Sequence, residues 1–143
     1  MRIPAFWDTS ALVPLCVRQS MTPNVVALYK IHDVVVWWTT PVEIASALAR
    51  LVRMQQINPG DCAKARKLAH VLADSWSVIQ PSETLRSRAL QLVERYDLRA
   101  ADSLQLAAAV EWCEGVPQGR VFLTTDERLR TAALLAGFDA IPM

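Results

Sequence analysis

The chain has few cysteines and histidines, and each shortage argues against a class of site. Among its 143 residues the three cysteines, Cys16, Cys62 and Cys113, are far apart and form no C-x-x-C pair. An odd number at such spacing indicates reduced, buried thiols and excludes a zinc-finger pattern. The two histidines, His32 and His70, lie outside every acidic motif, which disfavours a histidine general base.

Long apolar runs, linkers and excess charge are missing as well. Asp8 interrupts the first apolar run too early for a signal peptide, and no later run reaches transmembrane length, so we expect a cytoplasmic protein without membrane contact. No repeat or Pro/Gly/Ser-rich tract divides the chain, and residues 1–143 are expected to form one domain. With a net charge of +1, any contact to nucleic acid depends on local basic patches.

The residues that are present indicate an α/β protein. Hydrophobic residues make up 52% and charged residues 20% of the chain, as in compact globular proteins. Short apolar runs alternate with longer helical patterns, which is typical of βαβ units around a parallel sheet. Strands are expected at 3–7, 34–37, 76–79, 121–123 and 139–141. Helices are expected from residue 9, over 23–31, from 40, from 58–61 to near 75, over 82–96, after 97, and over 126–136.

Several helix ends carry recognisable signals. Thr40, Pro41 and Glu43 combine a hydroxyl cap, an early proline and an acid three residues after the cap, the pattern of a capping box. Asp97 is expected to cap the Ala-rich helix that follows it, and Gly137 is expected to close the last helix.

Acidic residues fall near the carboxyl ends of the expected strands. Asp8 directly follows the first strand, and Asp126 follows the strand at 121–123 by two threonines. Glu43 lies in the first turn of the helix after the second strand, whereas Asp102 lies near a helix start that does not directly follow a strand. Strand carboxyl ends and the next helix starts share one edge of a parallel sheet, where ligands bind. We therefore expect these carboxylates to meet there.

Each of these acids taken alone also has a structural explanation, as a helix cap or a partner of the helix dipole. Helix capping explains the four acids less well when they are taken together. Two carboxylates about 4 Å apart repel by about 4 kcal/mol at an effective dielectric near 20. A cation or raised pKa values must offset that repulsion. Mg²⁺ takes oxygen ligands and keeps several waters, which leaves room for a phosphodiester and an activated water.

Four segments, in this order, resemble the PIN-domain family, and within it the VapC-type toxins of bacterial toxin–antitoxin pairs. They are residues 8–12, 41–48, 98–107, and 122–126 followed by Leu129. They span nearly the whole chain. No segment is specific by itself, and the resemblance depends on all four together.

The resemblance implies a three-layer α/β/α domain with a central parallel sheet, and a bound Mg²⁺ or Mn²⁺. The metal ligands and catalytic residues that it implies are Asp8, Glu43, Asp102 and Asp126. It also implies an RNA substrate, a homodimer, and a protein antitoxin that inserts a segment near the acidic pocket. We therefore expect an endoribonuclease, the toxin of a type II pair, that hydrolyses RNA with a metal-activated water and no protein nucleophile.

Within that set we expect different roles. Asp8 and Asp102 are expected to be the innermost metal ligands. Glu43 and Asp126 are expected to bind a metal through water, to hold a second ion or to orient the attacking water. The number of ions stays open at this point.

Other residues have supporting roles in this interpretation. Thr124 matches a hydroxyl position beside the family's metal pocket, and Ser10 is expected to act similarly; ordinary helix-start roles are the alternative for both. Arg99 and Arg128 adjoin acidic segments and are expected to contact RNA phosphates, with solvated helix faces as the alternative. Most tryptophans are expected in the core. The apolar residues of the first two helices fit the core or an interface.

Other functions fit the sequence less well. A phosphoacceptor receiver domain needs a late lysine, and the last lysine here is Lys67. A haloacid-dehalogenase-type phosphatase needs an Asp two residues after the first one, where this chain has Ser10. The remaining alternative is a catalytically silent PIN-like module that binds RNA or protein. All the acidic positions are filled, which favours the enzyme without excluding that module.

Overall fold

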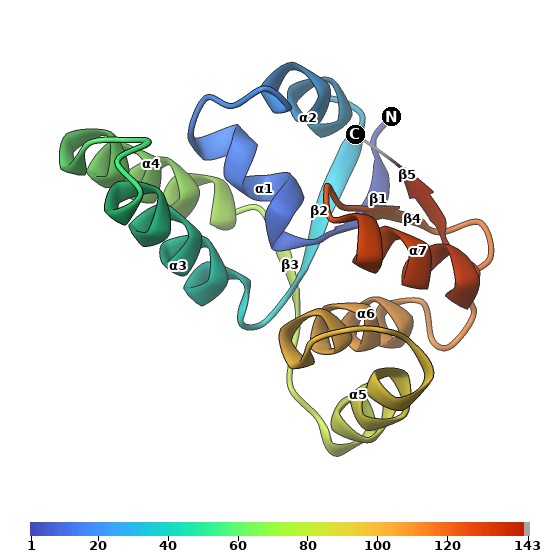
Figure 1. Cartoon of the computed structure of the whole chain (residues 1–143). Coiled ribbons are helices and arrows are strands. Elements are labelled where there is room, and N and C mark those ends of the chain that lie inside the picture. The colour runs from blue at the N-terminus through green and yellow to red at the C-terminus, as the bar shows by residue number, and fades with distance from the viewer. Residues whose placement is uncertain (142–143) are drawn as a thin grey trace.

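The computed structural model describes residues 1–141, in which one or two helices separate each strand from the next along the chain (Figure 1). The strands are β1 (Ile3–Trp7), β2 (His32–Trp37), β3 (Ser77–Ile79), β4 (Val121–Leu123) and β5 (Asp139–Ile141). The helices are α1 (Thr9–Cys16), α2 (Thr22–Tyr29), α3 (Thr40–Arg53), α4 (Pro59–Ala73), α5 (Glu83–Arg95), α6 (Ala100–Trp112) and α7 (Glu127–Ala136). Every strand and helix expected from the sequence is present, with ends shifted by only a few residues.

All five strands form one parallel sheet with the order β3-β2-β1-β4-β5. The chain moves outward from β1 to β3 and then crosses to the other side of β1 to add β4 and β5. The strand order therefore reverses between β1 and β4. In open α/β sheets this is where ligands bind, outside the carboxyl ends of the strands.

Helices cover both faces of the sheet, which confirms the expected three-layer α/β/α architecture (Figure 1). Side chains alternate between the faces with the period of two of a strand. Phe6 and Phe122 stack with ring centroids 5.4 Å apart in the core formed with α5, α6 and α7. Trp7 and Val36 belong to the opposite core, which includes residues of α1, α2, α3 and α4.

Residues whose place the sequence left open mostly lie in these cores. Leu12, Val13 and Val25 are buried in the core on one face of the sheet, whereas Val26 is exposed, so only part of the apolar surface of the first two helices belongs to the core. Trp7, Trp37 and Trp76 are buried, Trp112 is partly buried, and only Trp38 is strongly exposed. The cysteines are free, with Cys62 and Cys113 buried and Cys16 partly so. Within residues 1–141 we find no helix of the length and apolar character that crossing a membrane requires.

Two of the expected helix caps are wrong, although α3 begins at Thr40 as expected. Thr40 is already inside α3, the residue before the helix is Thr39, and no side chain caps the backbone there, so the capping box is absent. The side chain of Glu43 is engaged elsewhere, as described below. Asp97 does not cap α6, because Arg99 continues the extended chain and the helix begins only at Ala100.

The other end signals are confirmed. Asp126 caps α7, since its carboxylate accepts a hydrogen bond from the Leu129 N–H at 3.0 Å. Gly137 closes that helix with a φ of 112°, in the left-handed region that glycine enters without strain. Pro59 lies at the start of α4, where its missing N–H has no partner to lose.

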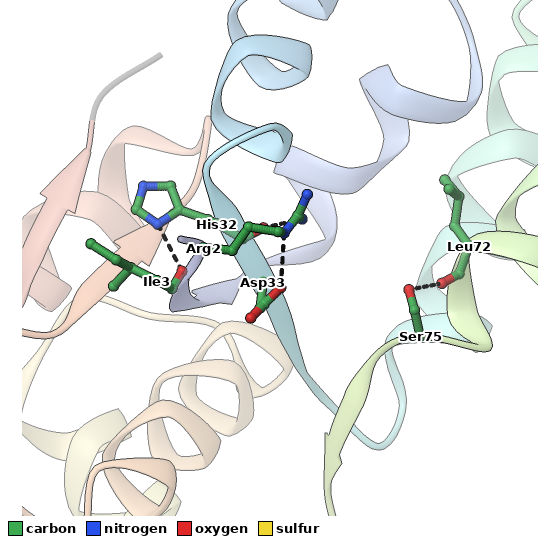
Figure 2. A network of polar contacts seen from close by, with 6 residues as sticks. All are labelled: Arg2, Ile3, His32, Asp33, Leu72 and Ser75. Atoms are coloured by element: carbon green, nitrogen blue, oxygen red, sulfur yellow. Dashed lines mark hydrogen bonds and ion pairs between the residues drawn. The ribbon is translucent and has the colours of Figure 1, made fainter.

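Neither histidine lies beside the four candidate acids. His32 lies at the amino end of β2, and its Nδ1 is 3.1 Å from the Ile3 carbonyl oxygen (Figure 2). Arg2 beside it donates to Asp33 at 2.8 Å and to the His32 carbonyl at 2.6 Å (Figure 2). This polar network holds β1 and β2 together at the end of the sheet opposite the switch point. His70 is exposed on α4.

Candidate active site

Asp8 lies at the switch point of the sheet. Its backbone N–H donates to the Leu123 carbonyl at 3.0 Å, which extends the pairing of β1 with β4 by one residue and fixes the Asp8 backbone. Its side chain is only 4% exposed. One carboxylate oxygen, Oδ2, accepts from the hydroxyls of Ser10 at 2.5 Å and Thr124 at 2.9 Å and from the Ser10 N–H at 3.3 Å. The other oxygen, Oδ1, accepts no hydrogen bond from residues 1–141.

Ser10 and Thr124 join the two loops on either side of the switch point. Each hydroxyl carries a single proton, and each donates that proton to Asp8. The same hydroxyls accept backbone N–H groups, Ser10 from Thr125 at 2.9 Å and Thr124 from Asp126 at 3.0 Å. The two oxygens are 3.1 Å apart. The arrangement holds the Asp8 carboxylate in one orientation, with Oδ1 facing away from this network.

Glu43 is held by three side chains from three parts of the fold. Its Oε1 accepts from the Thr9 hydroxyl and from the Gln105 amide, both at 3.1 Å. Its Oε2 accepts from the Thr39 hydroxyl at 2.6 Å. A carboxylate offers about four acceptor positions, so most of those on Glu43 are filled.

Asp102 and Asp126 have more unused oxygens. Asp102 is in the first turn of α6 and accepts no hydrogen bond from the described residues. Asp126 uses Oδ1 to cap α7, which leaves Oδ2 unengaged within residues 1–141. The two acids line a surface hollow of about 350 Å³ together with Glu127 and two arginines, Arg99 and Arg128.

The four carboxylates are near enough to influence one another. The pKa of Asp8 is raised from its usual 3.8 to about 6, chiefly by burial and further by the charges of Asp102 and Glu43, with the hydrogen bonds from Ser10 and Thr124 acting in the opposite direction. Burial also raises the pKa of Asp102, and the charges of Asp126 and Glu43 raise it further.

Basic side chains do not neutralise this group. The ion pairs of residues 1–141 involve other acids, so none of the four carboxylates has a lysine, arginine or histidine nitrogen within 4.0 Å. Arg99 and Arg128 lie far enough away to lower the pKa of Asp102 only partly. Arg128 has a partner of its own, Asp97, at 3.7 Å. The result is a like-charged cluster in which Asp8 is buried and the other three acids are partly exposed, with no basic nitrogen within 4.0 Å in residues 1–141.

The donor set suits a hard divalent cation. All four side chains offer carboxylate oxygens, and the unengaged ones belong to Asp8, Asp102 and Asp126. Within residues 1–141 no three acidic, histidine or cysteine side chains are placed to hold one ion together. Mg²⁺ does not need such a cage, because it keeps several waters and binds through one or two carboxylates. The residues therefore fit an ion with few direct ligands and water-mediated contacts to the rest.

Sequence reasoning identified Asp8, Ser10 and Thr124, which the structure joins directly by hydrogen bonds. It missed the side chains that hold Glu43, namely Thr9, Thr39 and Gln105. Gln105 is fully buried in an otherwise apolar part of α6. The available signal was a lone glutamine among leucines and alanines, three residues after Asp102.

Comparison with solved structures finds the same fold in toxin–antitoxin proteins. A chain of a toxin–antitoxin complex from Klebsiella pneumoniae shares 16% identity at a TM-score of 0.58, over 85% of this chain and 86% of that one. A chain of VapBC2 from Rickettsia felis, solved with a DNA fragment from the promoter, shares 10% sequence identity at a TM-score of 0.66. The match covers 98% of this chain and 98% of that one. A chain of FitAcB from Neisseria gonorrhoeae shares 17% sequence identity at a TM-score of 0.65. The match covers 94% of this chain and 96% of that one.

No curated protein matches the sequence. The family model for the PIN domain does match it, over residues 5–135, a range that includes all four candidate acids and both arginines of the hollow. With the fold, the topology and this match in agreement, the chain is a member of the PIN-domain family.

Proposed function

We propose that this PIN domain is a metal-dependent endoribonuclease and the toxin of a type II toxin–antitoxin pair. PIN domains are in general nucleases that use divalent metal ions. The observation that carries the proposal is Asp8. It is a buried acid at the switch point, its Oδ1 is unengaged, other acids surround it, and no basic side chain neutralises it. Such a group is costly to bury unless a cation binds it.

The residues would take two kinds of role. Asp8 and Asp102 would hold the ion directly, Mg²⁺ or in its place Mn²⁺, since Asp8 is buried at the switch point with Oδ1 unengaged and no described residue donates a hydrogen bond to Asp102. Glu43 and Asp126 would act through water, because both oxygens of Glu43 already accept hydrogen bonds and Asp126, whose Oδ1 caps α7, keeps Oδ2 for a water. When bound, the ion supplies Lewis acidity and a water of lowered pKa.

The surrounding side chains would prepare the hydrolysis. Ser10 and Thr124 keep Asp8 oriented, and their hydrogen bonds favour its charged form. Glu43 and Asp126 would accept hydrogen bonds from the attacking water and so aim its oxygen at the phosphorus. Hydrolysis adds the water's hydroxyl to phosphorus and its proton to the leaving oxygen. No serine or cysteine nucleophile is required.

Arg99 and Arg128 would bind the RNA backbone. Both line the hollow that contains Asp102 and Asp126, and they bring the positive charge that a phosphodiester needs next to an acidic site. Since the net charge of the chain is only +1, this local pair has more influence on RNA binding than the overall charge does.

We also propose a protein antitoxin and a homodimer as partners, with residues 1–143 as one cytoplasmic domain. An apolar hollow of about 280 Å³ between α3 and α4 supports a protein partner, because the exposed Pro41 and the partly exposed Ala45 and Ala69 line it next to Arg66 and His70. Such a surface suits an apolar segment with acidic flanks. Size-exclusion chromatography with light scattering, with and without the protein encoded beside this one, tests both partners.

The decisive experiment measures cleavage of a panel of RNAs by the antitoxin-free protein in Mg²⁺, in Mn²⁺ and in EDTA. Asp8→Asn and Asp102→Asn are compared with the wild type, and Asp33→Asn is the matched control, since Asp33 lies exposed at the other end of the sheet. We expect metal-dependent cleavage that both site variants lose and the control keeps. Cleavage that survives in EDTA or in Asp8→Asn contradicts the mechanism.

The alternative is a PIN-like module that binds RNA or protein without cutting it. It predicts a folded protein that binds no divalent metal and cleaves nothing in any of these conditions. Mn²⁺ titration of the folded wild type separates the two functions even when the panel lacks the natural substrate.

A further inference from the structure

Gln105 is a buried glutamine that links three elements around the candidate active site. Its side chain is fully buried in α6. The amide nitrogen Nε2 is 3.1 Å from Glu43 Oε1, 3.2 Å from the Thr9 hydroxyl and 3.4 Å from the Thr40 hydroxyl. One side chain of α6 thus contacts the start of α1 and the first turn of α3.

The orientation of this amide follows from its partner. A carboxylate accepts hydrogen bonds and donates none, so the Gln105 group at 3.1 Å from Glu43 must be the donating NH₂. A flipped amide would place two oxygens against each other. The amide oxygen of Gln105 consequently points the other way, where it is buried without a hydrogen-bond partner in residues 1–141.

This unpartnered oxygen argues against a purely packing role. Burying a polar atom without a partner is unfavourable, and a leucine or methionine would fill an apolar helix face without that penalty. The neighbouring positions, Leu106 and Ala107, are apolar and buried. The presence of a glutamine here is explained by its one strong contact, the charge-assisted hydrogen bond to Glu43.

The position of Gln105 on its helix matters too. Residues three apart lie on the same side of a helix, so Gln105 is one turn beyond Asp102 on the same side of α6. Since α6 would supply a metal ligand at Asp102 and also restrain Glu43 through Gln105, one rigid element sets the relative placement of both acids. Thr9 and Thr39 complete the restraint on Glu43.

We propose that Gln105 is a positioning residue that holds the Glu43 carboxylate in the orientation from which it would bind the metal through water; the proposal rests on the metal-dependent function proposed above. Gln105 does not touch the ion or the RNA and acts only through Glu43. Groups that orient metal ligands typically change metal affinity or activity about 10–100-fold when they are removed.

The test measures Mn²⁺ affinity of the full chain by isothermal titration calorimetry, without RNA. Gln105→Met keeps the length of the side chain and removes the amide. Ser103→Ala is the matched control, because Ser103 is also buried in α6 and its hydroxyl donates to the Ala89 carbonyl at 2.6 Å, away from the acids. Thermal unfolding of each variant reports on the fold.

We expect Gln105→Met to weaken Mn²⁺ binding about 10–100-fold, while Ser103→Ala binds as the wild type does. In a Glu43→Gln background the same Gln105→Met change should have no further effect, because residues that act through one another are not additive. Should Gln105→Met fail to fold, Gln105→Asn replaces it, since its amide is one methylene too short to reach Glu43.

Two results would overturn the positioning role alone. These are a folded Gln105 variant that binds Mn²⁺ like the wild type, and an equal loss in the Glu43→Gln background. Failure of the wild type itself to bind Mn²⁺ would instead remove the metal-dependent function and the positioning role with it.

Discussion

Replacing Asp8 by asparagine should stabilise the metal-free protein while it abolishes the proposed activity. In the absence of metal, burial and neighbouring acids raise the pKa of Asp8 from 3.8 to about 6. At pH 4–6 the folded chain therefore retains a proton that the unfolded chain has lost. The free energy of unfolding falls as the pH rises through this window, because the unfolded state binds fewer protons.

The magnitude follows from the shift. A rise from 3.8 to about 6 at 1.36 kcal/mol per unit corresponds to about 3 kcal/mol of lost stability above pH 6. Asparagine has nearly the same shape and no charge, and its oxygen still accepts from the Ser10 and Thr124 hydroxyls. Asp8→Asn should recover most of that loss at pH 8 and little of it at pH 4. Asp102, whose pKa is also raised, contributes in the same direction in both proteins.

The assay is urea unfolding in EDTA at several pH values between 4 and 8, with wild type, Asp8→Asn and the control Asp33→Asn. The wild type should lose stability across the window more steeply than Asp8→Asn, and Asp33→Asn should follow the wild type. If Asp8→Asn is less stable than the wild type at pH 8, the buried carboxylate is already compensated by the protein. The argument for a cation at this position would then be refuted.

Further predictions concern the metal, the RNA and the fold. Saturating Mn²⁺ should raise the stability of the wild type, by about 2.7 kcal/mol at 100 times its dissociation constant, and should leave Asp8→Asn unchanged in the same thermal melts. Arg99→Ala and Arg128→Ala should each weaken binding of single-stranded RNA regardless of its sequence. Each should also reduce by about 0.7 the slope of log affinity against log salt concentration. Filter binding at several salt concentrations checks this, and an unchanged slope counts against a phosphate contact. Gly137→Ala should lower the free energy of unfolding by about 1–3 kcal/mol. The reasons are that φ is 112° and that the added Cβ would lie 2.7 Å from Gln118 Nε2. If urea unfolding gave the variant the same stability as the wild type, that reasoning would be contradicted.

Local pattern was enough to predict most of the fold. Strands and helices differ in the period of their apolar residues, and that period can be read without tertiary information. The position of Asp8 immediately after a strand, and of Asp126 at a helix start, placed both near the carboxyl edge of a parallel sheet. The caps at Asp126 and Gly137 are also local, because each depends on residues within one turn.

Glu43 shows where local pattern misled. With Thr40 and Pro41 it has the spacing of a capping box, but in the structure its carboxylate is bound by Thr9, Thr39 and Gln105. Thr9 and Gln105 are 34 and 62 residues away in sequence, and their contacts compete with the local cap for the same oxygens. Hydrogen bonds over such separations leave no trace in periodicity.

The element types, the parallel α/β class and the acids at the strand ends could thus be predicted without coordinates, because they depend on spacing along the chain. Three other features follow from packing alone: which Asp8 oxygen is left unengaged, the lack of a basic partner within 4.0 Å of the acids in residues 1–141, and the contact of Gln105 with Glu43. Those features depend on how α1, α3, α6 and the β4–α7 turn pack around one edge of the sheet. Packing brings together side chains whose separation in sequence carries no information about their distance in space.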